Sequence, residues 1–550
     1  MPPLSRWLPF LRWPRPDAAL LRGEISAALT VAVVMVPQSV AYAGLAGMPL
    51  VTGLYATFLP ALAAVLFSSS TRLSVGPSAL SSVLVGASLL ELAQPGGAQW
   101  VTLAVWLALL AGIAQLAVGA TGAAWMLNLV SSPVLAGFSQ AAALLIIASQ
   151  LPALFGLEGP LKALLNGVPH FSIEAAAYGL ASLALMVLGR RYAPKLPMVL
   201  LVVAASGVLS HVTGFASRGA VIGQLPQGLP SFYWPAWPGF EAFGALVVPA
   251  VVIALVSSLE MASSAKIESQ HDGKRWDANQ DLVGQGMGKL ASALCGSFAT
   301  STSFSRSAIT LYAGARTGWA TVAATAVVLV VLLFLTPTLS PVPQAVLAAV
   351  VVTAVANLFK PRTLWALRRI DRVEAVTAFV TFAVTLVSAP RIYWGVLTGV
   401  ILGLGYFLYH RLHPRIIEVG LHPDGSLRDR HLWQLPPLAP HLYALRMDAE
   451  LDFGSASAFE RDIVEHVTEP NDVRHVCLFA HPINRVDATG VETFVQVRKL
   501  LAGRGITLHI SGIKLPVERV LERAGALEPG PLLKMYRTDA EALEAFRALA

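Results

Sequence analysis

The chain is organised around one polar stretch, which reads Ser301-Thr302-Ser303-Phe304-Ser305-Arg306-Ser307-Ala308-Ile309. Apolar sequence flanks this stretch on both sides, so its hydroxyls and its arginine are expected at membrane depth. An arginine there costs about 2.5 kcal/mol or more on insertion scales, and such residues mark functional sites. We therefore interpret the stretch as half of a binding site for an anion.

The composition points to a membrane protein. Of the 550 residues, 55% are hydrophobic and only 13% are charged, against roughly 25% in soluble domains. A net charge of +7 would suggest nucleic-acid binding in a soluble protein, but here the basic residues cluster in short loops between apolar segments. The sequence carries no hydrolase or metal-site motif. We expect no enzyme, no cofactor and no nucleic-acid partner.

Fourteen apolar segments lie between Glu24 and Tyr409, and several are shorter than the roughly 20 residues that a spanning helix needs. The third and the tenth each follow a polar stretch rich in small residues. Short interrupted segments at corresponding positions of two halves indicate a transporter's binding site. The expected segments are 26–43, 52–69, 78–92, 100–119, 128–150, 171–189, 196–214, 241–263, 281–297, 304–314, 319–336, 344–358, 372–388 and 392–410.

Basic residues in the loops predict the orientation. If both termini are cytoplasmic, the outside loops hold only Lys162, Arg218 and Arg391. The inside loops then hold Arg72, Arg190, Arg191, Lys195, Lys266, Lys274, Arg275, Arg316, Lys360, Arg362, Arg368, Arg369 and Arg372. Positive charge favours the cytoplasmic side, so we expect a multi-pass protein of the plasma (inner) membrane. The N-terminal residues, including Arg6 and Arg12, lack a cleavage site and are interpreted as an uncleaved cytoplasmic leader.

The two halves of the membrane region correspond as seven plus seven segments. Gln38 and Glu260 stand near the ends of the first and eighth segments, while Ser78 and Ser305 open the third and tenth. Seven segments bring the second half in from the opposite side of the membrane. The predicted fold is therefore an α-helical membrane protein of 14 segments in two inverted repeats.

The composition changes after Arg411, where charged residues mix with alternating apolar runs. Strands alternating with helices predict a small α/β domain. The expected strands are 443–447, 473–479 and 506–510, and the expected helices are 459–468, 489–501, 517–524 and 540–549. The predicted organisation is a leader (1–25), a transmembrane domain (26–410), a linker (411–440) and the α/β domain (441–550).

Two predicted helix starts carry the candidate anion site. Ser78 follows Gly76-Pro77 at the start of the third segment, and the second start bears Ser303, Phe304, Ser305 and Arg306. Free N–H groups at a helix start are partly positive and suit anions, although a simple kink would also explain the first start. The first segment offers Gln38 and Tyr42, which share one helical face and can also serve helix packing.

Glu260 is the candidate coupling residue. A carboxylate near the membrane interior pairs with a cation, binds one, or carries a proton. Ser264 lies one turn further on the same face. Two structural alternatives are open, namely that Glu260 pairs with Arg306 or that it ends its helix at the cytoplasmic interface. Lys289 follows a glycine-rich run, but Leu290 stands where a phosphate loop needs Ser or Thr, so we reject a phosphate loop.

At these residues the sequence resembles the SulP-type anion transporters, the family of sulfate permeases, bicarbonate and dicarboxylate carriers, pendrin and prestin. The resemblance covers nearly the whole chain. In the α/β domain, the loop 486–490 resembles that of the sulfate-transporter and anti-sigma-antagonist (STAS) domain. The stretches that carry it are Pro37-Gln38-Ser39-Val40-Ala41-Tyr42-Ala43, Ser74-Val75-Gly76-Pro77, Asn279-Gln280-Asp281-Leu282, Ser303-Phe304-Ser305-Arg306-Ser307 and Val486-Asp487-Ala488-Thr489-Gly490.

The resemblance implies a core domain that moves against a gate domain, and a homodimer. It places the anion among the first, third and tenth segments, with Gln38, Tyr42, Ser78, Ser305 and Arg306 lining the site. In sodium-coupled relatives an acid and a hydroxyl on the eighth segment bind sodium, and Glu260 and Ser264 occupy those positions. Ala488 replaces the serine that some relatives of the STAS domain phosphorylate, so no phospho-switch is expected there.

The function expected from these observations is secondary active transport of a small anion by alternating access. Because Glu stands where sodium-coupled relatives have Asp, proton coupling is favoured and sodium is a possible alternative. Bicarbonate, sulfate and a C4-dicarboxylate such as fumarate all suit the candidate site. The alternatives are a sodium-coupled bicarbonate symporter, an anion exchanger and an anion channel.

Overall fold

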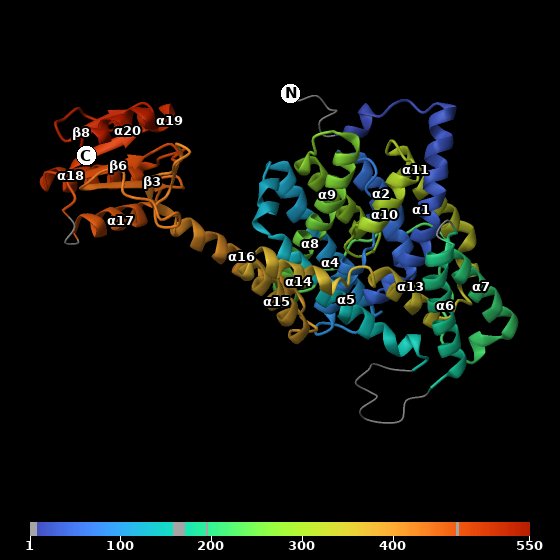
Figure 1. Cartoon of the computed structure of the whole chain (residues 1–550). Coiled ribbons are helices and arrows are strands. Elements are labelled where there is room, and N and C mark those ends of the chain that lie inside the picture. The colour runs from blue at the N-terminus through green and yellow to red at the C-terminus, as the bar shows by residue number, and fades with distance from the viewer. Residues whose placement is uncertain (1–7, 158–170, 194–195, 469–471, 550) are drawn as a thin grey trace. The chain divides into compact units, whose positions relative to one another are not determined.

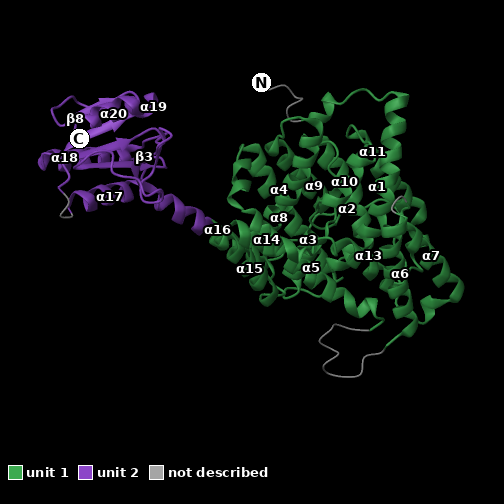
Figure 2. Cartoon of the chain, in the orientation of Figure 1, with its two compact units in different colours: residues 1–403 green, residues 404–550 purple. Residues whose placement is uncertain are grey.

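The computed structural model describes residues 8–157, 171–193, 196–468 and 472–549. Arg6, Lys162 and Lys195, which we expected in the leader and in loops, lie outside these residues. The chain divides into two compact units, residues 1–403 and residues 404–550 (Figure 2). The first unit is helical, and the second contains a six-stranded sheet.

The helices of the first unit follow the expected segments closely (Figure 1). Seven elements among the described residues are long and apolar enough to cross a membrane, and four shorter apolar helices accompany them, which is consistent with the expected segment count. The helices are α1 (Ala18–Leu45), α2 (Val51–Phe67), α3 (Ala79–Leu89), α4 (Ala98–Ala120), α5 (Ser132–Leu154), α6 (Ile173–Tyr192), α7 (Met198–Thr213), α8 (Phe240–Asp272), α9 (Ala278–Leu294), α10 (Phe304–Tyr312), α11 (Trp319–Val330), α12 (Thr336–Leu339), α13 (Gln344–Val355), α14 (Pro361–Ile370), α15 (Arg372–Val387) and α16 (Tyr393–Leu412).

Three features differ from the sequence expectation. Helix α1 already begins at Ala18, inside the predicted leader, because the Asp17 side chain accepts from the Leu20 N–H and caps the helix. The eleventh segment continues through a π-helical turn, Val331–Leu335, into α12. Helix α14 was expected as a loop; it starts at Pro361, a residue suited to the first helical position, and none of its residues is fully buried.

The helices pack in two groups, each drawn from both halves of the sequence. Helix α4 packs on α8 and α9, α2 packs on α9, and α1 packs on α11. In the other group, α5 packs on α13 and α15, and α6 packs on α7 and α13. Glycines permit close approaches in both groups, since a Cβ on Gly137 of α5 would lie 2.2 Å from the Ala378 carbonyl oxygen on α15, and one on Gly112 of α4 would lie 2.9 Å from Cβ of Lys289 on α9.

The second unit is an α/β domain whose sheet has the strand order β4-β3-β5-β6-β7-β8. Strands β5 (Leu442–Met447), β6 (His475–Phe479), β7 (Thr507–Ser511) and β8 (Leu533–Tyr536) run parallel, while β3 (Ile416–Leu421) and β4 (Leu427–Asp429) are antiparallel. Side chains of α17 (Ala456–Thr468), α18 (Ala488–Gly503) and α19 (Leu515–Arg523) share one core with the sheet, and those of α20 (Asp539–Arg547) share another.

The sequence correctly predicted three of these strands and all four helices to within a few residues, but it missed β3, β4 and β8. Strands β3 and β4 lie in the region 411–440 that we expected to be a linker, and β3 pairs with β5. The STAS-like loop begins α18, where Asp487 caps the helix by accepting from the Gly490 N–H at 2.8 Å.

Candidate functional site

Two short strands bring the two predicted helix starts together. Strand β1 (Val75–Gly76) pairs antiparallel with β2 (Ser301–Thr302), and α3 and α10 begin directly after them. Gly76 keeps this junction compact, because a Cβ there would lie 3.1 Å from Cγ2 of Thr57 and 3.3 Å from Nη2 of Arg306 and would crowd both side chains. The pairing therefore places the partly positive starts of α3 and α10 side by side.

Arg306 is fully buried at this junction, with 0% of its surface exposed. Its Nε donates to Ser74 Oγ at 3.2 Å, and its Nη2 donates to the Pro77 carbonyl at 2.8 Å. Its Nη1 has no hydrogen-bond partner among the described residues. A buried charged donor without a partner is costly, so the arrangement suits an incoming anion that would accept from Nη1.

Within the described part of the chain, the Glu260 carboxylate is held by hydroxyl groups alone. Its Oε2 accepts from Ser78 Oγ at 3.0 Å and from Ser301 Oγ. The expected alternative, an ion pair between Glu260 and Arg306, does not form between these described side chains, although the two interact electrostatically. One carboxylate oxygen thus links α8 to both the start of α3 and strand β2.

Gln38 and Tyr42 approach the junction from α1, and both are almost fully buried. The Gln38 Oε1 has no hydrogen-bond partner among the described residues. Helix α1 packs on both α3 and α10, and Tyr42 lies within electrostatic range of Arg306 and Glu260. Both residues therefore belong to the same polar region as the two helix starts.

Other predicted site residues occupy different environments. Ser78 caps α3 by accepting from the Ser81 N–H at 3.2 Å, whereas Ser303 makes no side-chain cap on α10. Ser303 Oγ and Ser305 Oγ lie 3.5 Å apart, and both Phe304 and Ser305 are exposed. Ser303, Phe304 and Ser305 therefore form the rim of the junction, whereas Ser78 belongs to its buried part.

Ser264 makes no hydrogen bond to the Glu260 carboxylate in the described residues, and the expectation that the two residues share a cation stays a prediction. Its hydroxyl donates to the main-chain carbonyl of Glu260 at 3.1 Å. A serine that bonds to the carbonyl four residues earlier is satisfied within its own helix. The hydroxyls that do contact the carboxylate, on Ser78 and Ser301, come from other elements. The sequence offered Ser301 only as part of a polar run, without a direction for its side chain.

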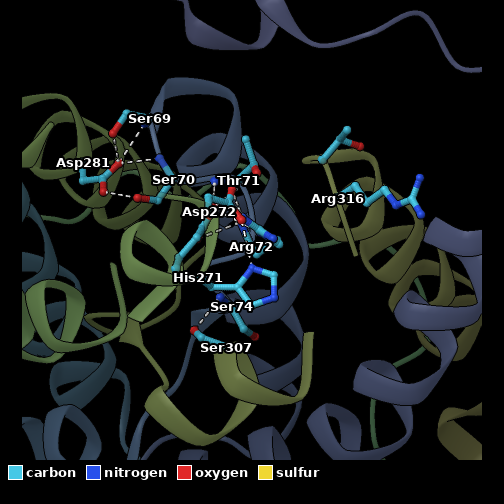
Figure 3. Close-up of polar contacts among 12 residues, drawn as sticks. Ser69, Ser70, Thr71, Arg72, Ser74, His271, Asp272, Asp281, Ser307 and Arg316 are labelled. Atoms are coloured by element: carbon cyan, nitrogen blue, oxygen red, sulfur yellow. Dashed lines mark hydrogen bonds and ion pairs between the residues drawn. The ribbon is translucent and has the colours of Figure 1, made fainter. Parts of the chain in front are cut away.

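A second polar cluster, which we call the loop cluster, fixes the segment that leads into β1. It consists of Ser69, Ser70, Thr71, Arg72, Glu268, Asp272 and Asp281, and Figure 3 shows the Ser69 and Ser70 side chains directed at Asp281. Arg72 was expected in an exposed cytoplasmic loop. It is buried instead, pairing with Glu268 at 3.3 Å and with Asp272.

A cavity of about 870 Å³ lies beside the loop cluster and is bordered by Lys266 and Arg275. It is lined by residues of α5, α8 and the start of α9. None of the candidate site residues, such as Arg306 or Glu260, borders it. The site is therefore defined by its polar contacts rather than by this cavity.

Comparison with known proteins agrees with this geometry. Residues 21–381 match the sulfate permease family, and residues 437–542 match the STAS domain. A probable sulfate transporter of Mycobacterium tuberculosis is 30% identical, with 96% of this chain and 95% of that protein covered. The chloroplastic sulfate transporter 4.1 of Arabidopsis thaliana is 27% identical, with 96% and 79% covered.

Solved structures share the fold. Murine Solute Carrier 26 family member A9, described as an anion transporter in the inward-facing state, superposes with a TM-score of 0.87 at 20% identity, covering 99% of this chain and 94% of that chain. The transmembrane domain of the cyanobacterial bicarbonate transporter BicA has a TM-score of 0.60 at 20% identity, covering 71% and 98%. The chain belongs to the sulfate permease family and is an anion transporter, not an enzyme.

Proposed function

We propose that the chain is a secondary active transporter that carries a small anion together with a proton. The observation that supports this proposal is that a basic and an acidic side chain among the described residues both lie at the β1–β2 junction and do not form an ion pair with each other. In the residues that the structure describes, buried Arg306 has no partner for Nη1, and Glu260 is held only by hydroxyls. The relatives named as sulfate transporters make sulfate a candidate substrate, beside bicarbonate and C4-dicarboxylates.

The chemistry of the site supports a proton at Glu260. A hydroxyl can either donate or accept, because its O–H rotates. Ser78 and Ser301 can therefore donate to the ionised carboxylate and accept from the protonated acid. Glu260 can gain and lose a proton without leaving a neighbour unsatisfied. An anion held by Arg306 and by the N–H groups at the two helix starts would favour the protonated acid, since it adds negative charge nearby.

The arrangement of the helices supports alternating access by an elevator-like motion. The candidate residues lie on α1, α3, α8 and α10, and their neighbours α2, α4, α9 and α11 pack with them as one group. We propose that this group is the core and that it moves against a gate of α5–α7 and α13–α16. The protein would act as a homodimer in the plasma (inner) membrane, with both termini cytoplasmic.

The proposal is tested with purified full-length protein in proteoliposomes. An inward proton gradient is expected to drive uptake of radiolabelled sulfate, fumarate or bicarbonate, and a protonophore should abolish that uptake. Replacing sodium by choline should change nothing. Uptake that requires an anion on the opposite side and ignores the gradient would instead identify an exchanger, and uptake that requires sodium would identify a sodium symporter.

A further inference from the structure

Lys289 is a second fully buried basic residue in the first unit, with 0% of its surface exposed. Its Nζ donates to Oε1 of Gln115 on α4 at 2.8 Å. The orientation of that amide is fixed, because Nε2 donates to the Ala254 carbonyl, which can only accept. No carboxylate lies within 4.0 Å of Lys289 Nζ among the described residues.

Two routes, each made partly of hydrogen bonds and partly of helix backbone, connect Lys289 to the anion site. Along the first, Gln115 Nε2 lies 2.9 Å from Ser257 Oγ and 2.7 Å from Ser258 Oγ, which stand three and two residues before Glu260 on α8. Lys289 is therefore linked through Gln115 to the part of α8 that carries Glu260. The Lys289 and Glu260 side chains interact electrostatically without forming an ion pair.

The second route runs along α9 to strand β2. Gln285 lies one turn before Lys289, and its Nε2 donates to Thr302 Oγ1 at 2.7 Å. Thr302 follows Ser301, the residue whose hydroxyl holds the Glu260 carboxylate. Gln285 thus ties α9 to β2, and Lys289 lies one turn further along the same helix face.

The total charge of the side chains in this region determines which ligand charge the site favours. When Lys289 is protonated, it and Arg306 contribute two positive charges, and Glu260 contributes one negative charge when it is ionised. A region of low polarity favours a total charge near zero. With Glu260 protonated, a divalent anion gives neutrality, whereas a monovalent anion leaves one positive charge.

We propose that Lys289 is a specificity residue that makes the site fit a divalent oxyanion, such as sulfate or a dicarboxylate, bound while Glu260 holds a proton. This inference rests on the proposed roles of Arg306 and Glu260. Lys289 acts from behind the site through its charge and makes no contact with the anion.

A charge effect has a signature that a change of shape lacks. The Coulomb energy between a fixed charge and a ligand is proportional to the ligand's charge. If loss of the Lys289 charge raises the Kd of a monoanion by a given factor, it should therefore raise the Kd of a dianion by the square of that factor. A loss of packing around α9 would lower both affinities without regard to ligand charge.

The test measures binding, which does not depend on proton-driven transport. Full-length protein in detergent is titrated calorimetrically at constant ionic strength with sulfate and nitrate, and with succinate and acetate. The measurements use the Glu260→Gln background, in which the side chain stays neutral. Lys289→Gln is expected to raise the Kd of nitrate about fivefold and that of sulfate about twenty-five-fold.

Two control variants accompany this measurement. Lys289→Arg retains the charge and should keep both affinities within about twofold, as expected for an unchanged Coulomb energy. Ser292→Ala removes a buried hydroxyl from the same helix, one that donates to the Phe298 carbonyl, and should leave the ratio of the affinities unchanged. Thermal melting establishes that each variant is folded.

Equal losses of sulfate and nitrate binding in Lys289→Gln would overturn the proposal, and so would no loss. If Lys289→Gln does not fold, the Glu260→Gln protein with Lys289 in place supplies the test. Tighter binding of sulfate than of nitrate supports the proposal, and tighter binding of nitrate contradicts it. Absence of binding by all four anions would contradict the proposed function itself, and this inference would fall with it.

Discussion

Two carboxylates on the same helix, Glu260 and Glu268, lie about two turns apart in very different surroundings. Glu268 accepts from the N–H groups of Thr71 and Arg72 at 3.0 and 3.3 Å, and from the Arg72 guanidinium at 3.3 Å. Among the described residues, Glu260 accepts only from two hydroxyls. N–H groups can only donate, so the partners of Glu268 favour its ionised form, whereas the partners of Glu260 tolerate either protonation state.

The arginines near these two acids differ in the same way. Arg72 pairs with both Glu268 and Asp272, so the positive charge of Arg72 is compensated within the loop cluster. Arg306 bonds to a hydroxyl and a carbonyl and keeps one donor free. Polar side chains that hydrogen-bond to one another stabilise a loop. Polar side chains at membrane depth that keep donors or acceptors without partners are available to bind a ligand or a proton.

The largest expected contrast is between Glu260→Gln and Glu268→Gln. Proton-driven anion uptake into proteoliposomes should fall to the level of protein-free liposomes in Glu260→Gln, because an amide cannot carry the proton. Exchange of labelled for unlabelled anion should persist in that variant. Glu268→Gln should keep uptake dependent on the proton gradient in the fraction that folds. Gradient-driven uptake in Glu260→Gln would assign the coupling proton to another group.

The second contrast concerns stability. Arg72→Gln should lower the free energy of unfolding by about 3–5 kcal/mol, because removing one partner of a buried ion pair leaves an uncompensated charge. Reversible unfolding in mixed detergent micelles measures this change. Arg306→Gln serves as the matched variant and should cost less stability, since Arg306 has no carboxylate partner to leave behind. A larger loss in Arg306→Gln would show that its role is structural.

The sequence predicted the parts of the site that stand out chemically. Arg306 and Glu260 are charged residues in apolar surroundings, and Ser78 follows a Gly-Pro pair, so their types alone drew attention. The approach of the two helix starts was also predicted, from the correspondence of the halves. The two-residue pairing of β1 with β2 is too short to produce a periodic pattern, and so the direction of the Ser301 hydroxyl could not be predicted.

Contacts between residues far apart in the chain could not be predicted from the sequence for a different reason. The sequence drew attention to Lys289 only through the glycine-rich run before it, because its partner Gln115 lies 174 positions away and is chemically ordinary. Arg72 was assigned to a loop on its charge, while the acids that bury it stand nearly 200 positions later. Tertiary packing, which local pattern does not contain, determines both environments.

A third and smaller effect is expected for Asp281, the buried acid of the loop cluster. Its Oδ1 accepts from the N–H groups of Ser69 and Ser70, each at 2.8 Å, and its Oδ2 accepts from Trp276 Nε1 at 2.8 Å. Asp281→Asn turns one acceptor into a donor that faces these donors, which should cost about 1–3 kcal/mol of unfolding free energy. The KM for anion uptake should stay unchanged, and a changed KM would extend the anion site to this cluster.

The smallest effects are expected for the two hydroxyls that hold Glu260. Ser301→Ala and Ser78→Ala each remove one of its two donors, and the remaining donor should limit the fall in proton-driven uptake to about tenfold, the scale of one hydrogen bond to a charged group. Ser78→Ala should also lose about 1 kcal/mol of stability, because Ser78 caps α3. Ser303→Ala at the rim is the control, and an equal loss of uptake there would mean that the hydroxyls act on the anion rather than through Glu260.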